Sequence, residues 1–346
     1  MTPRRFINLF PKKFVFVKLI NYFLFKLSFI LKLKKMIFLP VTMDIEPTTG
    51  CNFRCTMCQV SSPNFQSKNM EIETFQKIIR ENKQLIKIKL QGMGEPLVNK
   101  YLFDMIKFAK EFGVGTEIIS NGSLLNEKNI NFLLDNKLSK LTISIDGATK
   151  KTFESIRVKS NFDTVVKNSK LFSSSIKKKI FRPEFSAWCT VQKENFDEVE
   201  NIAILCRDIG FDDLTFQVHL TGWGKDEWNK INENKKIEYK NLEIKNHFTN
   251  IIKKYSNKNF KIKVFDNNLL SFKKKCSWPI NSSYVASTGE IVPCCIIGDP
   301  KVVNYGNIKS TSFKEIWNSE AYYKLRKNID NNEIDDFCKS RYKEYS

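Results

Sequence analysis

Three cysteines within eight residues are the feature that most constrains the fold and chemistry of this chain. Cys51, Cys55 and Cys58 follow the spacing C-x3-C-x2-C. A loop this short can direct three thiolates at one inorganic centre, and iron–sulfur clusters are held by thiolates, normally four of them. Three ligands leave one iron open to a substrate or a cofactor. A zinc site would need a further ligand such as histidine, and none lies nearby, so the spacing favours an iron–sulfur cluster.

The cysteine loop follows a predicted strand, and strands alternate with helices through the next 170 or so residues. Strands are predicted at 41–46, 86–91, 116–120, 140–145, 184–191 and 214–218, and helices at 72–82, 100–112, 127–136 and 196–209. Six such repeats predict an α/β fold with a parallel sheet curled into a partial barrel. The chemistry of such folds lies at the carboxyl ends of the strands, where the cysteine loop is placed.

The loop and the turn after the second predicted strand resemble the radical S-adenosylmethionine (SAM) superfamily. The matching residues are Glu46-Pro-Thr-Thr-Gly before Cys51, the cysteine triplet, and Gly92-Met-Gly-Glu-Pro96. The resemblance implies a partial (β/α)6 TIM-like barrel with a [4Fe–4S] cluster on the triplet. It also implies that SAM binds the open iron and is cleaved reductively to a 5′-deoxyadenosyl radical, which abstracts hydrogen from a substrate. Gly94 and Glu95 would bind the SAM amino group.

Further SAM contacts are implied at the ends of later strands. Asn121 would face the cofactor, and Gln192 would contact it. Ser144 and Arg157 would hold the SAM carboxylate, because a guanidinium donates two parallel hydrogen bonds to a carboxylate. Asp146 stands in an Asp-Gly pair, which is typical of a turn, although contact with substrate is an alternative.

A second cysteine set lies near the end of the chain. Cys276, Cys294 and Cys338, with a Gly-x4-Cys motif and an Asn-Ile-Trp framework, resemble the SPASM domain or its shorter twitch form, which bind auxiliary iron–sulfur clusters. Relatives usually end in C-x2-C, whereas Arg341 stands at the last position here. The fourth ligand position of an auxiliary cluster is therefore either open or filled by Cys295 or Arg341. Too few cysteines remain for two auxiliary clusters. The alternative is that these thiols bind nothing.

The first 40 residues carry nine basic and no acidic side chains, within a net charge of +20 for the chain. Residues 14–39 predict a basic amphipathic helix whose polar stripe holds Lys18, Asn21, Ser28, Lys32 and Lys35. Its uncharged runs are too short to span a bilayer. Two interpretations stay open: a membrane-surface anchor, or a helix packed on the outside of the catalytic domain.

Four regions follow from these patterns: the N-terminal segment 1–40, the radical SAM core 41–218, a bridging region 219–275, and the auxiliary domain 276–346. Residues 219–260 of the bridging region are predicted to be irregular apart from a Lys- and Asn-rich helix. Cys189 and Cys206 fall in strand and helix patterns as buried thiols. A low-potential cluster needs a reducing compartment, so the sequence predicts a cytoplasmic protein, peripheral at the inner membrane face if the N-terminal segment is an anchor.

The predicted activity is oxidative modification or dehydrogenation of a peptide or a small molecule, with reduced flavodoxin or ferredoxin as electron donor. The positive charge permits an anionic partner but also fits a lysine-rich surface. An RNA-modifying radical SAM enzyme is an alternative, but such relatives lack the C-terminal cysteines, so nucleic acid is not expected as a partner. A non-catalytic iron–sulfur binding or assembly protein is a further alternative, against which the complete set of SAM-binding residues argues.

Overall fold

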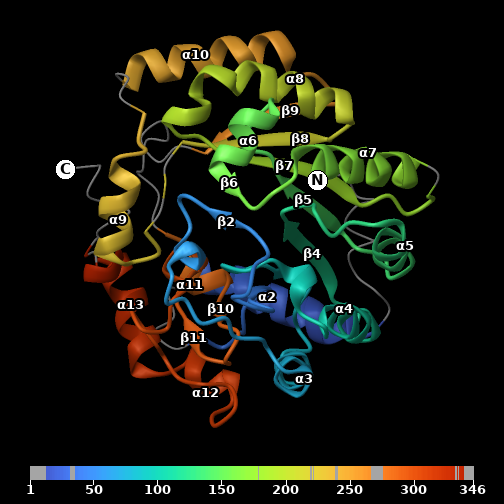
Figure 1. Cartoon of the computed structure of the whole chain (residues 1–346). Helices are drawn as coiled ribbons and strands as arrows, with labels where there is room; N and C mark the ends of the chain where they lie inside the picture. The colour runs from blue at the N-terminus through green and yellow to red at the C-terminus, as the bar shows by residue number, and fades with distance from the viewer. Residues whose placement is uncertain are drawn as a thin grey trace.

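The structure is a computed structural model of the 346-residue chain. It describes residues 13–31, 36–177, 179–218, 220, 222–237, 241–265, 276–331, 333 and 335–338. One nine-stranded sheet organises the fold, in the order β11-β10-β1-β3-β4-β5-β7-β8-β9. The sheet curls into a partial barrel, and helices α3 to α8 cover its outer face (Figure 1).

The predicted α/β partial barrel is confirmed, and all six predicted strands form its parallel centre. They are β1 (Thr42–Ile45), β3 (Lys87–Leu90), β4 (Gly115–Ser120), β5 (Lys140–Ser144), β7 (Glu184–Thr190) and β8 (Asp213–Gln217). The helices are α3 (Ile72–Glu81), α4 (Leu102–Glu111), α5 (Glu127–Asp135), α6 (Lys150–Ile156), α7 (Phe162–Lys177) and α8 (Val199–Ile209). Along α3 the apolar side chains recur at helical spacing, so Phe75, Ile78 and Ile79 are buried together against the sheet.

A seventh parallel strand lies in the bridging region, at residues for which no strand was predicted. Strand β9 (Lys261–Phe265) pairs with β8 and follows α9 (Asp226–Glu233) and α10 (Asn241–Tyr255), the Lys- and Asn-rich helix. The sequence does not predict β9 because alternate positions of this edge strand carry exposed lysines, and Ile262 is its one buried side chain. Charged side chains are the usual protection of a sheet edge, and they hide the apolar pattern of a strand.

The C-terminal domain continues the barrel sheet at the opposite edge. Strand β10 (Tyr284–Val285) runs parallel to β1 with Asp44 opposite Tyr284, and β11 (Ile291–Val292) pairs antiparallel with β10. The helices of this domain are α11 (Trp278–Asn281), α12 (Phe313–Trp317) and α13 (Glu320–Asp330). The sheet therefore fixes the second cysteine set in position relative to the first strand of the barrel.

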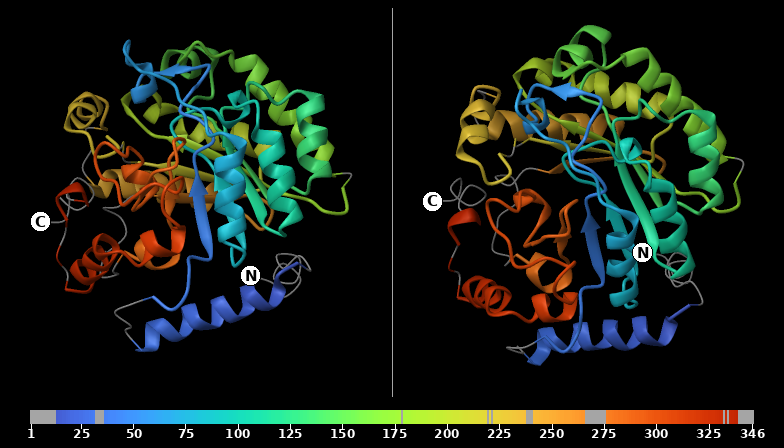
Figure 2. Two further views of the ribbon diagram at one scale, coloured as in Figure 1. Left: turned by 90° about the horizontal axis from the view of Figure 1, so that it is seen from below. Right: turned by 60° about the horizontal axis from the view of Figure 1, so that its bottom comes forward.

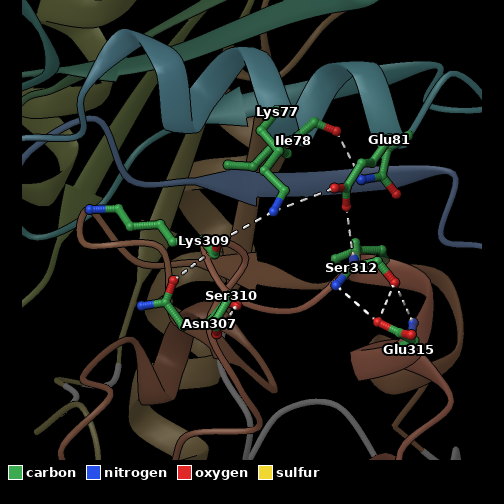
Figure 3. A network of polar contacts seen from close by, with 10 residues as sticks. Lys77, Ile78, Glu81, Asn307, Lys309, Ser310, Ser312 and Glu315 are labelled. Carbon is green, nitrogen blue, oxygen red and sulfur yellow. Dashed lines mark hydrogen bonds and ion pairs between the residues drawn. The ribbon is translucent and has the colours of Figure 1, made fainter.

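Helix α3 of the barrel holds the start of α12 through polar contacts (Figure 3). Lys77 donates to the Lys309 carbonyl (3.4 Å), and Glu81 accepts from the Phe313 backbone N–H (2.9 Å). Ser312 and Glu315 form a capping box that satisfies the first N–H groups of α12. These bonds add a second attachment of the C-terminal domain to the barrel, beside the β1–β10 pairing.

Helix α2 (Val15–Leu31) lies across the end of the barrel where β1 begins, away from the cysteine loop (Figure 2). The helix predicted over residues 14–39 is confirmed for Val15–Leu31, whereas residues 36–39 are not helical. Helix α2 packs on the catalytic domain. Its polar residues Lys18, Asn21 and Ser28 are buried. The Asn21 amide exchanges two hydrogen bonds with the backbone of Leu39 (2.8 and 2.9 Å). Lys32 and Lys35 of the predicted stripe lie outside the described residues. None of the described helices is long and apolar enough to cross a membrane.

Candidate active site

A small antiparallel ribbon fixes the cysteine loop. Its strands are β2 (Arg54–Cys55) and β6 (Arg157–Val158), and Cys55 stands opposite Arg157 in the register. The Thr56 N–H extends the ribbon by donating to the Ile156 carbonyl (2.9 Å). Two predicted site residues from distant parts of the chain are thereby held side by side by backbone hydrogen bonds.

The three thiols line one cavity of about 460 Å³ at the carboxyl ends of the strands. Five of the six predicted SAM-binding residues line the same cavity, namely Gly94, Glu95, Asn121, Ser144 and Arg157. Gln192 is not among the residues that line it; this side chain is fully buried, and its backbone N–H donates to Asn195 Oδ1 (2.9 Å).

The turn after β3 approaches the cysteine loop so closely that only glycine fits at position 94. A Cβ atom there would lie 2.3 Å from the Gly50 carbonyl oxygen and 2.5 Å from that of Thr48. The backbone N–H of Glu95 donates to the same Gly50 carbonyl (2.8 Å). The turn therefore supports the residue that precedes Cys51, and a side chain at Gly94 would push the two apart.

The Glu95 carboxylate organises the ends of β3 and β4. It is buried, and it accepts hydrogen bonds from the Ser120 hydroxyl (2.9 Å) and from the backbone N–H groups of Asn121 (2.6 Å) and Leu97 (3.2 Å). Burial raises the pKa of Glu95, and these donors oppose the shift. Asn121 in turn donates through Nδ2 to Asn52 Oδ1 (2.9 Å) and lies 3.9 Å from Cys51 Sγ.

Arg157 joins the cysteine loop to the barrel interior. Its Nη2 lies 2.7 Å from Asp146 Oδ2, and its Nη1 lies 3.9 Å from Cys55 Sγ. Its Nε is buried and has no hydrogen-bond partner in the part of the chain that the structure describes. A buried guanidinium with an unused donor beside the cavity fits an anionic group of a ligand, such as the SAM carboxylate.

Asp146 lies behind this arginine and is fully buried. Its Oδ1 accepts from the Thr190 N–H (2.8 Å), which ties the end of β5 to the end of β7. Burial raises the pKa of Asp146, and the adjacent Arg157 guanidinium opposes the shift. The sequence suggested only a turn or a substrate contact here, because nothing in the spacing of Asp146 and Arg157 shows that they meet.

Glu46, at the end of β1, is a site residue to which the sequence analysis gave no role of its own. It is almost fully buried, and its carboxylate accepts from the N–H groups of Met93 (2.9 Å) and Ser287 (3.1 Å). It links the turn after β3 to the C-terminal domain. An acid at the end of a buried strand is the sequence signal that could have singled it out.

The donor set of the loop suits an iron–sulfur cluster. Burial raises the pKa of Cys55 to about 11 and that of Cys58 to about 12, and a bound metal centre would favour the thiolate forms. Among the described residues, no three His, Cys, Asp or Glu side chains are grouped as the ligands of one metal ion. Thiolates are the ligands that a four-iron cube uses, and all three thiols of the loop line the same cavity.

Consecutive cysteines of the second set face two different sites. Cys294 and Cys338 both interact electrostatically with Tyr305. Cys295 instead lines the active-site cavity, packs with Trp278 against the cluster of Tyr284, Ala286 and Val292, and interacts with Lys89 of β3. Neither Cys294 nor Cys338 is among the residues that line this cavity. Arg341, the other alternative, lies outside the described residues.

The comparisons with known proteins agree with this fold. The model of the radical SAM superfamily matches residues 45–203, and that of the SPASM iron–sulfur cluster-binding domain matches residues 276–340. The chain belongs to the radical SAM superfamily and carries a C-terminal SPASM domain. Its cofactors are a [4Fe–4S] cluster, SAM and auxiliary iron–sulfur.

Its relatives include enzymes that act on different kinds of substrate. It is 24% identical to the AdoMet-dependent heme synthase of Methanosarcina barkeri over 81% of this chain and 83% of that protein. It is also 24% identical to the mycofactocin maturase MftC of Mycolicibacterium smegmatis, over 56% of this chain and 48% of the maturase, about half its length. Streptococcus suis SuiB, solved with its precursor peptide SuiA, shares the fold with a TM-score of 0.64. The two sequences are 16% identical, and the match covers 83% of this chain and 66% of SuiB.

Proposed function

We propose that this radical SAM enzyme oxidatively modifies a peptide substrate. The observation that carries the proposal is a second cavity of about 480 Å³, which shares Met93 and Gly298 with the active-site cavity. The two cavities adjoin at these residues, so a ligand that occupied both would reach from the cysteine triplet to the C-terminal residues Ser287 and Lys301. A space of this form suits an extended chain better than a compact molecule.

The lining of the outer cavity supports a peptide. Side chains and backbone groups that can bond to a peptide backbone surround it, including Asn64, Gln66, Lys68, Ser287 and Lys301. The inner cavity is more apolar, with Trp188, Trp223 and Trp278 in its wall. Such a wall excludes water from the reacting atoms. The backbone of the substrate peptide would thus be held in the outer cavity, while one of its side chains reaches into the inner cavity.

A chain of polar contacts lies in the wall of the outer cavity. Lys225 donates to Gln59 Oε1 (2.9 Å) and forms an ion pair with Asp299. Gln59 is almost fully buried, and its amide contacts Met93 Sδ (2.7 Å). These contacts join the cysteine loop, the bridging region and the C-terminal domain beside the path of the proposed substrate.

Different residues of the inner cavity would bind the cluster and SAM. When bound, the cluster and SAM supply the 5′-deoxyadenosyl radical that abstracts hydrogen from the substrate. Cys51, Cys55 and Cys58 would hold the cluster. The backbone of the Gly94–Glu95 turn would receive the SAM amino group, and the unused Arg157 Nε would donate to the SAM carboxylate.

We further propose that Cys276, Cys294 and Cys338 hold an auxiliary cluster, which supplies an acceptor for the electron lost by the substrate. Reduced flavodoxin or ferredoxin would be the electron donor of the enzyme. The protein would act in the cytoplasm, because no disulfide joins its cysteines and a low-potential cluster needs a reducing compartment.

A small-molecule substrate is a second candidate, supported by the likeness to the heme synthase over most of both chains. The test uses the reconstituted enzyme with SAM, dithionite and precursor peptides encoded beside its gene. A decrease in peptide mass coupled to deoxyadenosine formation is expected. The outer-cavity variant Lys68→Glu/Lys301→Glu should raise the peptide KM at least tenfold and leave uncoupled SAM cleavage unchanged. Turnover of small molecules alone, unaffected by this variant, would contradict the peptide proposal.

A further inference from the structure

Helix α2 is turned with its apolar side outward. Viewed along the helix, the inward arc holds Lys18, Asn21, Phe25 and Ser28, all buried. The opposite arc holds five large apolar side chains that remain exposed: Phe16 (81%), Val17 (45%), Leu19 (44%), Ile20 (60%) and Phe23 (65%). Globular proteins normally place these faces the other way round. An exposed apolar face of this kind marks an interaction surface.

The inward face fixes this orientation. The Lys18 ammonium donates to the carbonyl groups of Gly113 and Phe112, just past the end of α4. A cation at the C-terminus of a helix is favoured by the unpaired carbonyls and by the helix dipole. The two hydrogen bonds between the Asn21 amide and the Leu39 backbone hold the middle of the helix. Rotating α2 to hide its apolar face would break these bonds and leave buried polar groups unpaired.

The charged side chains around the exposed apolar face of α2 indicate the kind of partner that would bind it. Lys13 and Lys26 are exposed on the same helix, and the first 40 residues contain nine basic side chains and no acidic one. A basic surround of this kind would repel a second copy of the same surface. An apolar stripe flanked by lysines is complementary to the surface of a bilayer with anionic head groups, where the apolar side chains enter the interface and the lysines meet the phosphates.

We propose that the outer face of α2, formed by Phe16, Val17, Leu19, Ile20 and Phe23, docks on the surface of a membrane that contains anionic lipids. The helix lies along the outside of the molecule (Figure 2). The cysteine loop is at the other end of β1, so a membrane-bound enzyme keeps its active site open to substrate. This inference is independent of the peptide substrate proposed above.

Flotation of the full-length holoenzyme with lipid vesicles tests the proposal. Binding to vesicles of phosphatidylglycerol and phosphatidylcholine is expected to exceed binding to phosphatidylcholine alone, and to weaken at high salt. The variant Phe16→Ser/Ile20→Ser/Phe23→Ser should reduce the partition coefficient at least tenfold. The matched control Leu171→Ser/Ile180→Ser/Leu242→Ser removes three other exposed apolar side chains and should bind like the unmodified protein.

Three outcomes would overturn the proposal. One is that the unmodified protein does not float with anionic vesicles. Another is that the α2 variant floats as well as the control. The third is that the unmodified protein is a dimer in solution, does not float, and becomes monomeric in the α2 variant, which would assign the face to a second copy of the chain. Unchanged SAM cleavage in both triple variants verifies that they are folded.

Discussion

Asp146 and Arg157 form a buried ion pair between the end of β5 and the ribbon that carries Cys55, with 2.7 Å between Oδ2 and Nη2. The carboxylate holds one edge of the guanidinium, and the other groups of the arginine face Cys55 and the cavity. Asp146 thereby sets the direction of the donor that is proposed to bind SAM. We regard Asp146 as a positioning residue that acts through Arg157.

The substitution Asp146→Asn should weaken SAM binding about tenfold, because the guanidinium loses the charged partner that orients it. Leaving a buried charge unpaired should also lower the free energy of unfolding by about 3 kcal/mol. Equilibrium dialysis with SAM and denaturant unfolding measure the two effects. Asp163→Asn removes the acid of an exposed pair with Lys150 and should change neither by a measurable amount. SAM affinity equal to that of the unmodified enzyme would contradict the positioning role.

The substitution Gly94→Ala should reduce iron incorporation and SAM binding together, because a Cβ at this position would displace the backbone before Cys51. Iron analysis after anaerobic reconstitution, followed by SAM titration, measures both. Gly115→Ala is the control, since its nearest obstacle is the hydroxyl of Ser139 at 2.9 Å and no backbone atom lies within 3.5 Å. Full iron content in Gly94→Ala would show that the loop tolerates the displacement.

The neighbours Cys294 and Cys295 should respond differently to replacement by alanine. Cys294→Ala should lose the auxiliary cluster, so the iron content falls from about eight to about four per chain. Cys295→Ala should keep both clusters, because Cys295 faces the active-site cavity. Iron and sulfide analysis, with electron paramagnetic resonance of the reduced protein, separates the two. Equal loss of iron in both variants would make Cys295 a ligand.

Lys18 should make the stability of the protein rise with pH in a defined range. Burial lowers the pKa of Lys18 from 10.5 to about 8. Between these two values the unfolded chain holds a proton that the folded chain has released, so the free energy of unfolding increases with pH. Relative to Lys18→Met, the gain should reach roughly 3 kcal/mol by pH 10.5. Denaturant unfolding from pH 7 to 10.5 measures it, and parallel profiles for the two proteins would contradict it.

The barrel and its cofactors could be predicted from the sequence because their signals are local. The cysteine spacing, the Gly92–Pro96 turn and the alternating strands each lie within a few neighbouring residues. The sequence does not show which strand-end residues face the ligand and which support them: Asp146 and Glu46 contact groups that are distant in the chain. Five predicted SAM residues line one cavity, whereas Gln192, chosen by the same resemblance, lies behind its wall.

Helix α2 shows a different limit. Its period and polar stripe were predicted, but periodicity gives two faces and does not determine which one is buried. Tertiary hydrogen-bond acceptors decide the question here, since the carbonyls of Phe112 and Gly113 and the backbone of Leu39 receive the polar face. Strand β9 was not predicted for a related reason. Its exposed lysines hide the apolar pattern of a strand, and the structure identifies it by its pairing with β8.

The formation of 5′-deoxyadenosine from SAM tests the central claim, that the loop of Cys51, Cys55 and Cys58 supports radical chemistry. The assay compares the reconstituted enzyme with its Cys55→Ala variant under dithionite, with Cys206→Ala as a control at a buried thiol outside the site. We predict deoxyadenosine from the unmodified enzyme and from Cys206→Ala, and none above background from Cys55→Ala. SAM cleavage by Cys55→Ala at the rate of the unmodified enzyme would contradict the account.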